Sequence, residues 1–207
     1  MRIAFVGAQG TGKTTLVNKL RVNKNFQPDF HVYEEVVRSL IKTRGIKINR
    51  EGTNFSQDLV SITHLNNAME SYYNYSDALF DRCIIDSHAY AMQCMQDGFV
   101  SSESVNYSSR IMNAIFHTFP FDLVIYIPPY REFLKEDGVR DTDTEYQEKI
   151  AIHMKNTIHV LKNTHPDLDI VELETIGIDE RVQEIKDYLE ETGRIEMEQR
   201  EIHLDGE

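Results

Sequence analysis

Short apolar runs alternate with helical patterns along the whole chain. Five runs bounded by glycine, proline or polar residues are typical of buried strands, and they lie at 3–6, 30–33, 78–85, 121–127 and 169–173. Apolar residues at helical spacing predict helices at about 13–22, 35–43, 54–72, 86–96, 103–118, 144–163 and 179–191. Strands that alternate with helices favour a parallel sheet covered on both faces. The pattern therefore predicts an α/β fold.

A long predicted helix begins at a cap formed by Asn54 or Ser56 and carries a stripe of six large apolar residues. These are Phe55, Leu59, Ile62, Leu65, Met69 and Tyr72. Periodic apolar stripes usually face the protein interior. We expect this stripe to pack in the core and not to contact a ligand.

Composition and length indicate a single globular domain. With 207 residues, of which 41% are hydrophobic and 27% charged, the chain has enough apolar material for a substantial core. We place the domain at 1–191 and an acidic C-terminal tail at 192–207. No apolar run approaches the ~20 residues that cross a bilayer, and Gly7 comes too early for a signal peptide. We expect a cytoplasmic protein without a membrane partner, whose two cysteines, Cys83 and Cys94, are reduced.

The net charge of −12 argues against a surface that grips nucleic acid everywhere, since phosphate contacts need lysine and arginine. The charge is nevertheless uneven. Between Val36 and Arg50 there are five basic residues and no acid, namely Arg38, Lys42, Arg44, Lys47 and Arg50. This basic island indicates a site for an anionic substrate, and the alternative is a solvated helix face followed by a loop.

Residues 7–14, GAQGTGKT, match the phosphate-binding pattern G-x-x-x-x-G-K-[ST] without deviation. Glycines let backbone N–H groups approach phosphates, and the helix that follows adds the positive end of its dipole. Lys13 is expected to reach the β- and γ-phosphates and Thr14 to offer its hydroxyl to Mg²⁺. The predicted cofactors are Mg²⁺ and ATP, with GTP as the alternative. The expected nucleotide-binding residues are Gly7, Gly10, Thr11, Gly12, Lys13, Thr14 and Thr15.

Charged residues follow two other predicted strands, at the sheet edge where ligands bind in open α/β folds. Asp81 is a candidate to hold Mg²⁺ through water, and Arg82 a candidate to grip a phosphate; the alternative is a surface ion pair. Glu35 follows the second strand and could take a proton from a substrate hydroxyl, unless it only stabilises a helix N-terminus. Arg38 and Lys42 share one face of the next helix.

A polar loop at about 130–143 contains Arg131, Lys135 and Arg140. A basic loop that closes over a nucleotide would exclude water and supply charge to the transferring group. The alternative for this loop is a solvated linker.

Together these residues resemble a family, the P-loop kinases grouped around the nicotinamide-riboside kinase domain of the NadR type, also described as AAA-like ATPase domains and related to thymidylate and deoxynucleoside kinases. The resemblance covers about residues 1–190. It rests on the segments Gly7–Thr14, Glu35–Arg38, Phe80–Arg82 with Asp86 and Tyr90, and Glu136–Arg140.

The resemblance implies a five-stranded parallel sheet in the order 2-3-1-4-5 with a lid after the fourth strand. It implies Glu35 as catalytic base, Asp81 and Arg82 at the substrate and metal edge, and Arg140 as the lid arginine. It also implies that Tyr90 and Arg38 lie at the acceptor site and that the loop containing Gly177 holds adenine. Cys83 stands where thymidylate kinases have a tyrosine, which argues against thymidylate as the substrate. Asp86 is expected to be a helix N-cap.

The leading functional hypothesis is an ATP-dependent kinase for a nucleoside or nucleoside monophosphate. Two alternatives are a binding module that uses the triphosphate as a switch and a kinase acting on a base or an end within DNA or RNA, which the net charge disfavours. The arginines exceed what a neutral acceptor needs, so the sequence slightly favours an acceptor that already carries phosphate. The oligomeric state stays open, a homodimer being one option.

Overall fold

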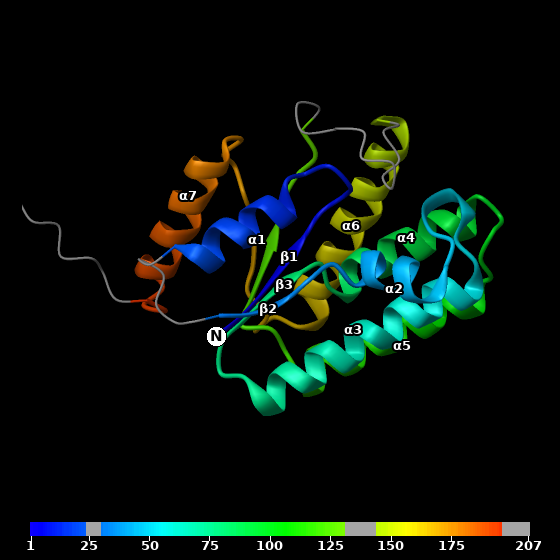
Figure 1. Ribbon diagram of the computed structural model, residues 1–207, viewed down its shortest axis with the longest axis horizontal. Helices are drawn as coiled ribbons and strands as arrows, with labels where there is room; N and C mark the ends of the chain where they lie inside the picture. Colours follow the sequence, from blue (N-terminus) through cyan, green and yellow to red (C-terminus); the bar gives the residue numbers. More distant parts are fainter. Residues whose placement is uncertain (24–29, 131–143, 196–207) are drawn as a thin grey trace, which may run out of the picture.

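A computed structural model describes residues 1–23, 30–130 and 144–195. Within these residues, five parallel strands form one sheet in the order β2-β3-β1-β4-β5 (Figure 1). The α/β class and the strand order implied by the resemblance are therefore confirmed. The strands are β1 Arg2–Val6, β2 His31–Tyr33, β3 Ala78–Asp81, β4 Leu123–Tyr126 and β5 Ile170–Glu172.

Helices cover both faces of the sheet, as Figure 1 shows. One face is covered by α1 (Lys13–Val22) and α7 (Ile178–Glu191). The opposite face is covered by a larger layer made of α3 (Asn54–Asn74), α4 (Ile84–Gln96), α5 (Ser102–Thr118) and α6 (Thr144–Thr164). Between β2 and α3 lie α2 (Val36–Arg44) and the short 3-10 helix η1 (Asn49–Glu51). No helix among the described residues has the length and apolar character that crossing a lipid bilayer requires.

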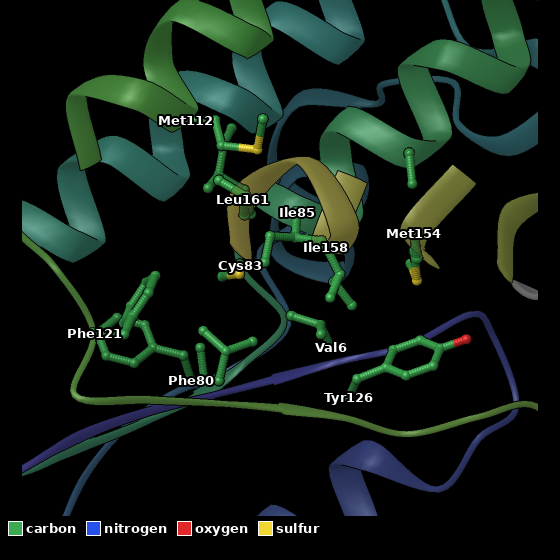
Figure 2. Packing of buried hydrophobic residues seen from close by; sticks show 14 of the residues in the cluster. Val6, Phe80, Cys83, Ile85, Met112, Phe121, Tyr126, Met154, Ile158 and Leu161 are labelled. Carbon is green, nitrogen blue, oxygen red and sulfur yellow. The ribbon is translucent and has the colours of Figure 1, made fainter. Parts of the chain in front are cut away.

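The central strand β1 is buried on both faces, which explains its continuous apolar run. Ile3 and Phe5 pack with the side chains of α1 and α7. Ala4 and Val6 point the other way, into the cluster that Figure 2 shows around Phe80 and Tyr126. The two cores fix the sheet between its helical layers and leave the carboxyl ends of the strands free to carry polar groups.

The prediction that the apolar stripe on α3 packs in the core is wrong for four of its six residues; Leu59 and Leu65 are half-buried and pack against core clusters. Phe55 is 68% exposed and Tyr72 47% exposed, and Ile62 and Met69 also face solvent. The buried face of α3 consists mostly of small and polar residues, namely Ser56, Gln57, Val60, Ser61, His64, Ala68 and Ser71. Along the N-terminal half of α3 this inward face borders a cavity, and further along the helix Ala68 packs in the core on the sheet. The N-cap of α3 is Thr53, whose side chain accepts a hydrogen bond from the backbone N–H of Ser56.

Strand register brings three chain segments to one edge. Phe5 is paired with Asp81, and Tyr33 with Phe80. The residues that follow β1, β2 and β3 therefore leave the sheet side by side. The third strand ends at Asp81 and not near Ile85, because Arg82 adopts a left-handed conformation with φ of 79°, which extended pairing does not allow.

Candidate active site

The phosphate-binding loop between β1 and α1 needs its glycines. Gly10 and Gly12 have φ of 72° and 85°, a region that other residues rarely adopt. At Gly7 a Cβ atom would lie 2.6 Å from the carbonyl oxygen of Ile127, closer than packing allows. The loop then passes directly into α1 at Lys13, as phosphate binding at a helix N-terminus requires. Thr15 lies exposed on the first turn of that helix.

The Lys13 side chain is buried inside the loop. Its ammonium donates to the carbonyl oxygens of Gly7 and Ala8, both at 2.7 Å, and to Thr11 Oγ1 at 3.0 Å. Burial and the charge of Arg82 lower the pKa of Lys13 to about 7. All three acceptors are uncharged, so they compensate the buried cation weakly. Phosphate oxygens would be stronger partners for this ammonium.

Thr14 and Asp81 meet beside the loop. Thr14 Oγ1 donates to Asp81 Oδ2 at 2.6 Å. The other carboxylate oxygen, Oδ1, is buried and has no hydrogen-bond partner within the described part of the chain. A hydroxyl and an under-used carboxylate are the hard oxygen donors that Mg²⁺ takes in phosphoryl-transfer sites, with water and phosphate completing its shell. No cluster of three or more metal-ligating His, Cys, Asp or Glu residues occurs in the described ranges.

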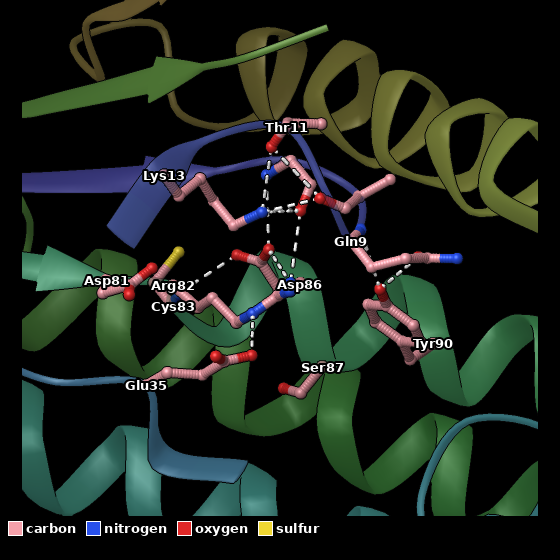
Figure 3. A network of polar contacts seen from close by, with 12 residues as sticks. Gln9, Thr11, Lys13, Glu35, Asp81, Arg82, Cys83, Asp86, Ser87 and Tyr90 are labelled. Atoms are coloured by element: carbon pink, nitrogen blue, oxygen red, sulfur yellow. Dashed lines mark hydrogen bonds and ion pairs between the residues drawn. The ribbon is translucent and has the colours of Figure 1, made fainter. Parts of the chain in front are cut away.

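Arg82 is the centre of a buried polar network (Figure 3). Its Nε donates to Glu35 Oε1 at 2.8 Å, and its Nη1 donates to Asp86 Oδ1 at 2.9 Å and to the carbonyl oxygen of Gly7 at 3.2 Å. Burial opposes the charge of Arg82, but the two carboxylates prevail and hold its pKa well above the usual value. Arg82 is only 7% exposed. The alternative of a surface ion pair, which the sequence left open, is therefore wrong.

Asp86 is not the N-cap residue of α4, so that prediction is wrong, although Asp86 belongs to the capping box of this helix. The N-cap is Cys83, and Asp86 stands three residues later, where its carboxylate accepts from the Cys83 N–H at 3.1 Å and from the Gly7 N–H at 3.2 Å. It is also the buried counter-ion of Arg82. Sequence reasoning missed this role because an acid near a helix start has the same pattern whether it caps that helix or pairs with a neighbour.

Glu35 precedes α2 and makes no side-chain bond to the end of that helix. Its carboxylate instead accepts from Arg82 Nε and from Arg38 Nε, the latter at 2.7 Å. Burial alone would raise the pKa of Glu35, but the charge of Arg82 and the hydrogen bond from Arg38 lower it to about 2. Glu35 is therefore ionised at neutral pH and held in place by two arginines.

A cavity opens beside this network between α2, α3 and α4, and Glu35, Arg38, Arg82 and Tyr90 all contribute to its wall. Tyr90 ties the wall to the phosphate loop, since its hydroxyl donates to Gln9 Oε1 at 2.6 Å and accepts from the Gln9 N–H at 3.2 Å. The buried face of α3 adds two residues that sequence reasoning missed, Gln57 and His64. Burial and the charge of Arg82 lower the pKa of His64 to about 3, so its ring is neutral.

The basic island does not form a row of uncompensated cations. Arg38 is bound to Glu35, Lys47 lies 3.4 Å from Glu51, and the Arg50 guanidinium stacks over the Tyr146 ring at 5.0 Å. Lys42 lines a groove next to the cavity, and Glu34, Glu35 and Asp81 line the same groove. These contacts argue against the prediction that the basic island is a site for an anionic substrate.

Gly177 lies at the N-cap of α7, close to the phosphate loop: the side chain of the next residue, Ile178, lies 3.3 Å from the position of a Cβ on Gly12. Arg140 and the predicted lid from 131 onward lie outside the described residues, as does the tail from 196 onward. Only Tyr130, at the start of the lid, belongs to the described structure.

The comparisons with known proteins agree with this fold. Residues 2–168 match the model of the family described as AAA domain, and the chain belongs to that family. None of the curated proteins compared with the sequence matches it.

Solved structures extend the likeness to nearly the whole chain. A NadR protein in complex with NR is 19% identical with a TM-score of 0.71, over 96% of this chain and 53% of that one. A deoxyadenosine kinase from M. mycoides with bound dATP is 17% identical with a TM-score of 0.66, over 91% and 99% of the two chains. Thymidylate kinase from Candida albicans is 16% identical with a TM-score of 0.60, over 93% and 92%. The chain spans about half the length of the NadR structures, and at these identities the likeness concerns the fold.

Proposed function

We propose that the chain is a kinase that transfers the γ-phosphoryl group of ATP to a hydroxyl of a nucleoside. The observation that carries the proposal is the position of Arg82, which links Glu35 on the cavity wall to the Gly7 carbonyl oxygen at the start of the phosphate loop. Arg82 therefore joins the candidate proton acceptor, Glu35, to the phosphate loop. In-line transfer requires the acceptor hydroxyl and the γ-phosphate to be neighbours, and this contact keeps the residues proposed to bind them close together. The similar folds of solved nucleoside and nucleotide kinases support the same reading.

Each group has a role in this reaction. The loop N–H groups and Lys13 bind the phosphates, and Thr14 and Asp81 would hold Mg²⁺, which neutralises charge on the phosphoryl oxygens. Glu35 orients the acceptor hydroxyl and takes its proton as the new O–P bond forms and the bond to the β-phosphate oxygen breaks. A weakly basic carboxylate suffices because the hydroxyl becomes acidic only late in a loose transition state. Arg82 stabilises the charge that develops on the transferring group.

The charges around the cavity favour a neutral acceptor over a monophosphate. Arg82 is bound by Glu35 and Asp86, and Arg38 is bound by Glu35, so two carboxylates already face two arginines. A second phosphate would have to displace carboxylates from these buried pairs. We therefore propose a nucleoside, which replaces the slight preference for a phosphorylated acceptor that the composition alone gave.

The two other hypotheses have weaker support. A polynucleotide kinase would use the basic island as a phosphate track, yet Arg38, Lys47 and Arg50 are each engaged within the protein. A nucleotide switch would need no ionised carboxylate beside a cavity. The proposal also includes four predictions from the sequence. Residues 1–191 form one catalytic domain, and the donor is ATP in preference to GTP. Arg140 belongs to a lid, and the loop containing Gly177 binds adenine.

The test is a panel of nucleosides, nucleoside monophosphates and short oligonucleotides incubated with labelled ATP and Mg²⁺. We expect label to appear on one or more nucleosides, to require Mg²⁺ and to vanish with Lys13→Ala. Efficient labelling of monophosphates alone would overturn the neutral-acceptor proposal. Labelling of oligonucleotides, with a steep dependence on salt, would favour the polynucleotide hypothesis. ATP binding without transfer to any member of the panel would favour the switch.

A further inference from the structure

The direction of the bound triphosphate follows from the sheet. The acceptor residues Glu35 and Arg82 follow β2 and β3, on one side of the phosphate loop that follows β1. The γ-phosphate must point to that side for transfer. The nucleoside end of the donor then lies on the other side, above β4 and β5, where the loop 173–177 leaves the sheet.

One arginine joins this loop to the phosphate loop. Arg181, in the first turn of α7, is 0% exposed. Its Nη1 donates to the carbonyl oxygen of Thr11 at 2.7 Å, and its Nε donates to the carbonyl oxygen of Thr175 at 3.0 Å. The same guanidinium lies over the Tyr130 ring, 5.3 Å from its centroid. Three segments far apart in sequence therefore meet at one buried side chain.

The surroundings fix this arginine and the loop. Glu184, one turn further along α7, accepts from the N–H groups of Glu174 and Thr175 at 2.8 and 3.1 Å. A Cβ atom on Gly12 would lie 3.3 Å from Arg181 Nη1, so the close approach of the guanidinium depends on glycine at that position. The loop 174–177 is thus held by α7, and Arg181 hydrogen-bonds both to this loop and to the phosphate loop.

We infer that Arg181 is a positioning residue for the donor nucleotide: it sets the distance between the loop that receives the nucleoside moiety and the loop that receives the phosphates. Being fully buried, it acts through the two carbonyl oxygens and does not touch the nucleotide itself. The rigid, forked guanidinium can hold two acceptors at a fixed spacing, whereas a lysine ammonium cannot. This inference rests on the proposed function, because it assumes a nucleoside triphosphate donor.

The experiment compares two ligands that differ only in the nucleoside. ATP uses both loops, whereas inorganic tripolyphosphate can use the phosphate loop alone. Arg181→Met should weaken ATP binding roughly 10- to 100-fold, the usual effect of losing charge-assisted hydrogen bonds. Tripolyphosphate binding should change less than about threefold, since Lys13 and the loop N–H groups remain. Calorimetry with Mg²⁺ measures both affinities.

The matched control is Arg110→Met, which removes an exposed arginine on α5 and should leave both affinities unchanged. If Arg181→Met does not fold, Arg181→Lys keeps the charge without the fork, and we expect the same selective loss of ATP affinity at a smaller size. Equal losses for both ligands, or no loss for either, would overturn the inference. Failure of the unaltered protein to bind ATP would instead contradict the proposed function, so the two failures are distinguishable.

Discussion

Two buried cations meet at the Gly7 carbonyl oxygen, yet their surroundings differ. Lys13 approaches from the phosphate loop, and its other acceptors are also uncharged oxygens. Arg82 approaches from the acceptor side, and its other partners are the carboxylates of Glu35 and Asp86. Accordingly the pKa of Lys13 is lowered to about 7 by burial, while the pKa of Arg82 is held well above its usual value.

If the proposed function is right, the difference suits two substrates of different charge. The hydrogen-bond acceptors of Lys13 are uncharged oxygens, so a triphosphate would give this ammonium an anionic partner. The acceptor side is already balanced, so a neutral molecule enters it at the lowest electrostatic cost. The two sides of the site would thus select different substrates, because Lys13 has uncharged partners and Arg82 has carboxylate partners.

The largest effect is expected at the acceptor side, from Glu35→Gln. The amide cannot take a proton, so kcat should fall roughly 10²- to 10⁴-fold. ATP affinity should change far less than kcat, because in the described structure Glu35 is linked to the phosphate loop through Arg82 and not directly. Steady-state kinetics with calorimetry checks both, and unchanged kcat would remove Glu35 from the chemistry.

Asp86→Asn should destabilise the fold by about 3–5 kcal/mol, since it breaks a buried ion pair and leaves Arg82 with one carboxylate fewer. Denaturant unfolding measures the change. Asp81→Asn is the matched control, because Asp81 accepts one hydrogen bond from Thr14 and pairs with no arginine in the described residues. It should cost little stability but most of the Mg²⁺-dependent turnover. The opposite ranking would mean that the two carboxylates have exchanged roles.

Lys13→Ala should lower ATP affinity at least about 100-fold, through loss of a cation aimed at the phosphates in a buried site. The fold should survive, because Lys13 belongs to neither of the two core clusters on the sheet. Calorimetry and thermal unfolding provide the two values, with the exposed Lys19→Ala as control. Equal ATP affinity in the variant would refute the assignment of the phosphate loop.

The lowered pKa of Lys13 predicts a pH dependence with a definite sign. Between about 7 and the usual value of 10.5 the unfolded chain binds the proton more tightly than the folded one. Stability should therefore rise with pH in this window, relative to Lys13→Met, by at most about 1.4 kcal/mol per pH unit. ATP should reverse the trend and cause proton uptake at pH 8, seen as a dependence of binding enthalpy on the buffer. If the stabilities of the unaltered protein and of Lys13→Met change with pH in parallel, Lys13 has an ordinary pKa in the folded protein.

The smallest effect concerns Arg38→Ala, whose guanidinium is partly exposed. We expect KM for the acceptor to rise about three- to tenfold, because Glu35 loses one of two arginines that orient it. ATP affinity should stay constant. A fall in ATP affinity would place Arg38 on the donor side and weaken the contrast between the two sides.

Sequence reasoning placed residues correctly where the pattern is local. The predicted phosphate loop is a continuous run that joins β1 to α1, and the positions of Asp81 and Glu35 follow from strand ends. It failed for α3, because periodicity tells which residues share a face but not what that face meets. It also missed Asp86 and Arg181, whose partners lie 79 and 170 residues away in the chain at Gly7 and Thr11.

The three partners of Arg82 have a thermodynamic consequence. One guanidinium contacts the acceptor wall through Glu35, the start of α4 through Asp86, and the phosphate loop through Gly7. An acceptor whose hydroxyl attracts Glu35 would weaken the ion pair between Glu35 and Arg82. The contact of Arg82 with the phosphate loop, where the triphosphate would bind, would then change as well. By thermodynamic linkage the effect is mutual: if the bound acceptor changes the affinity for ATP by some factor, bound ATP changes the affinity for the acceptor by the same factor.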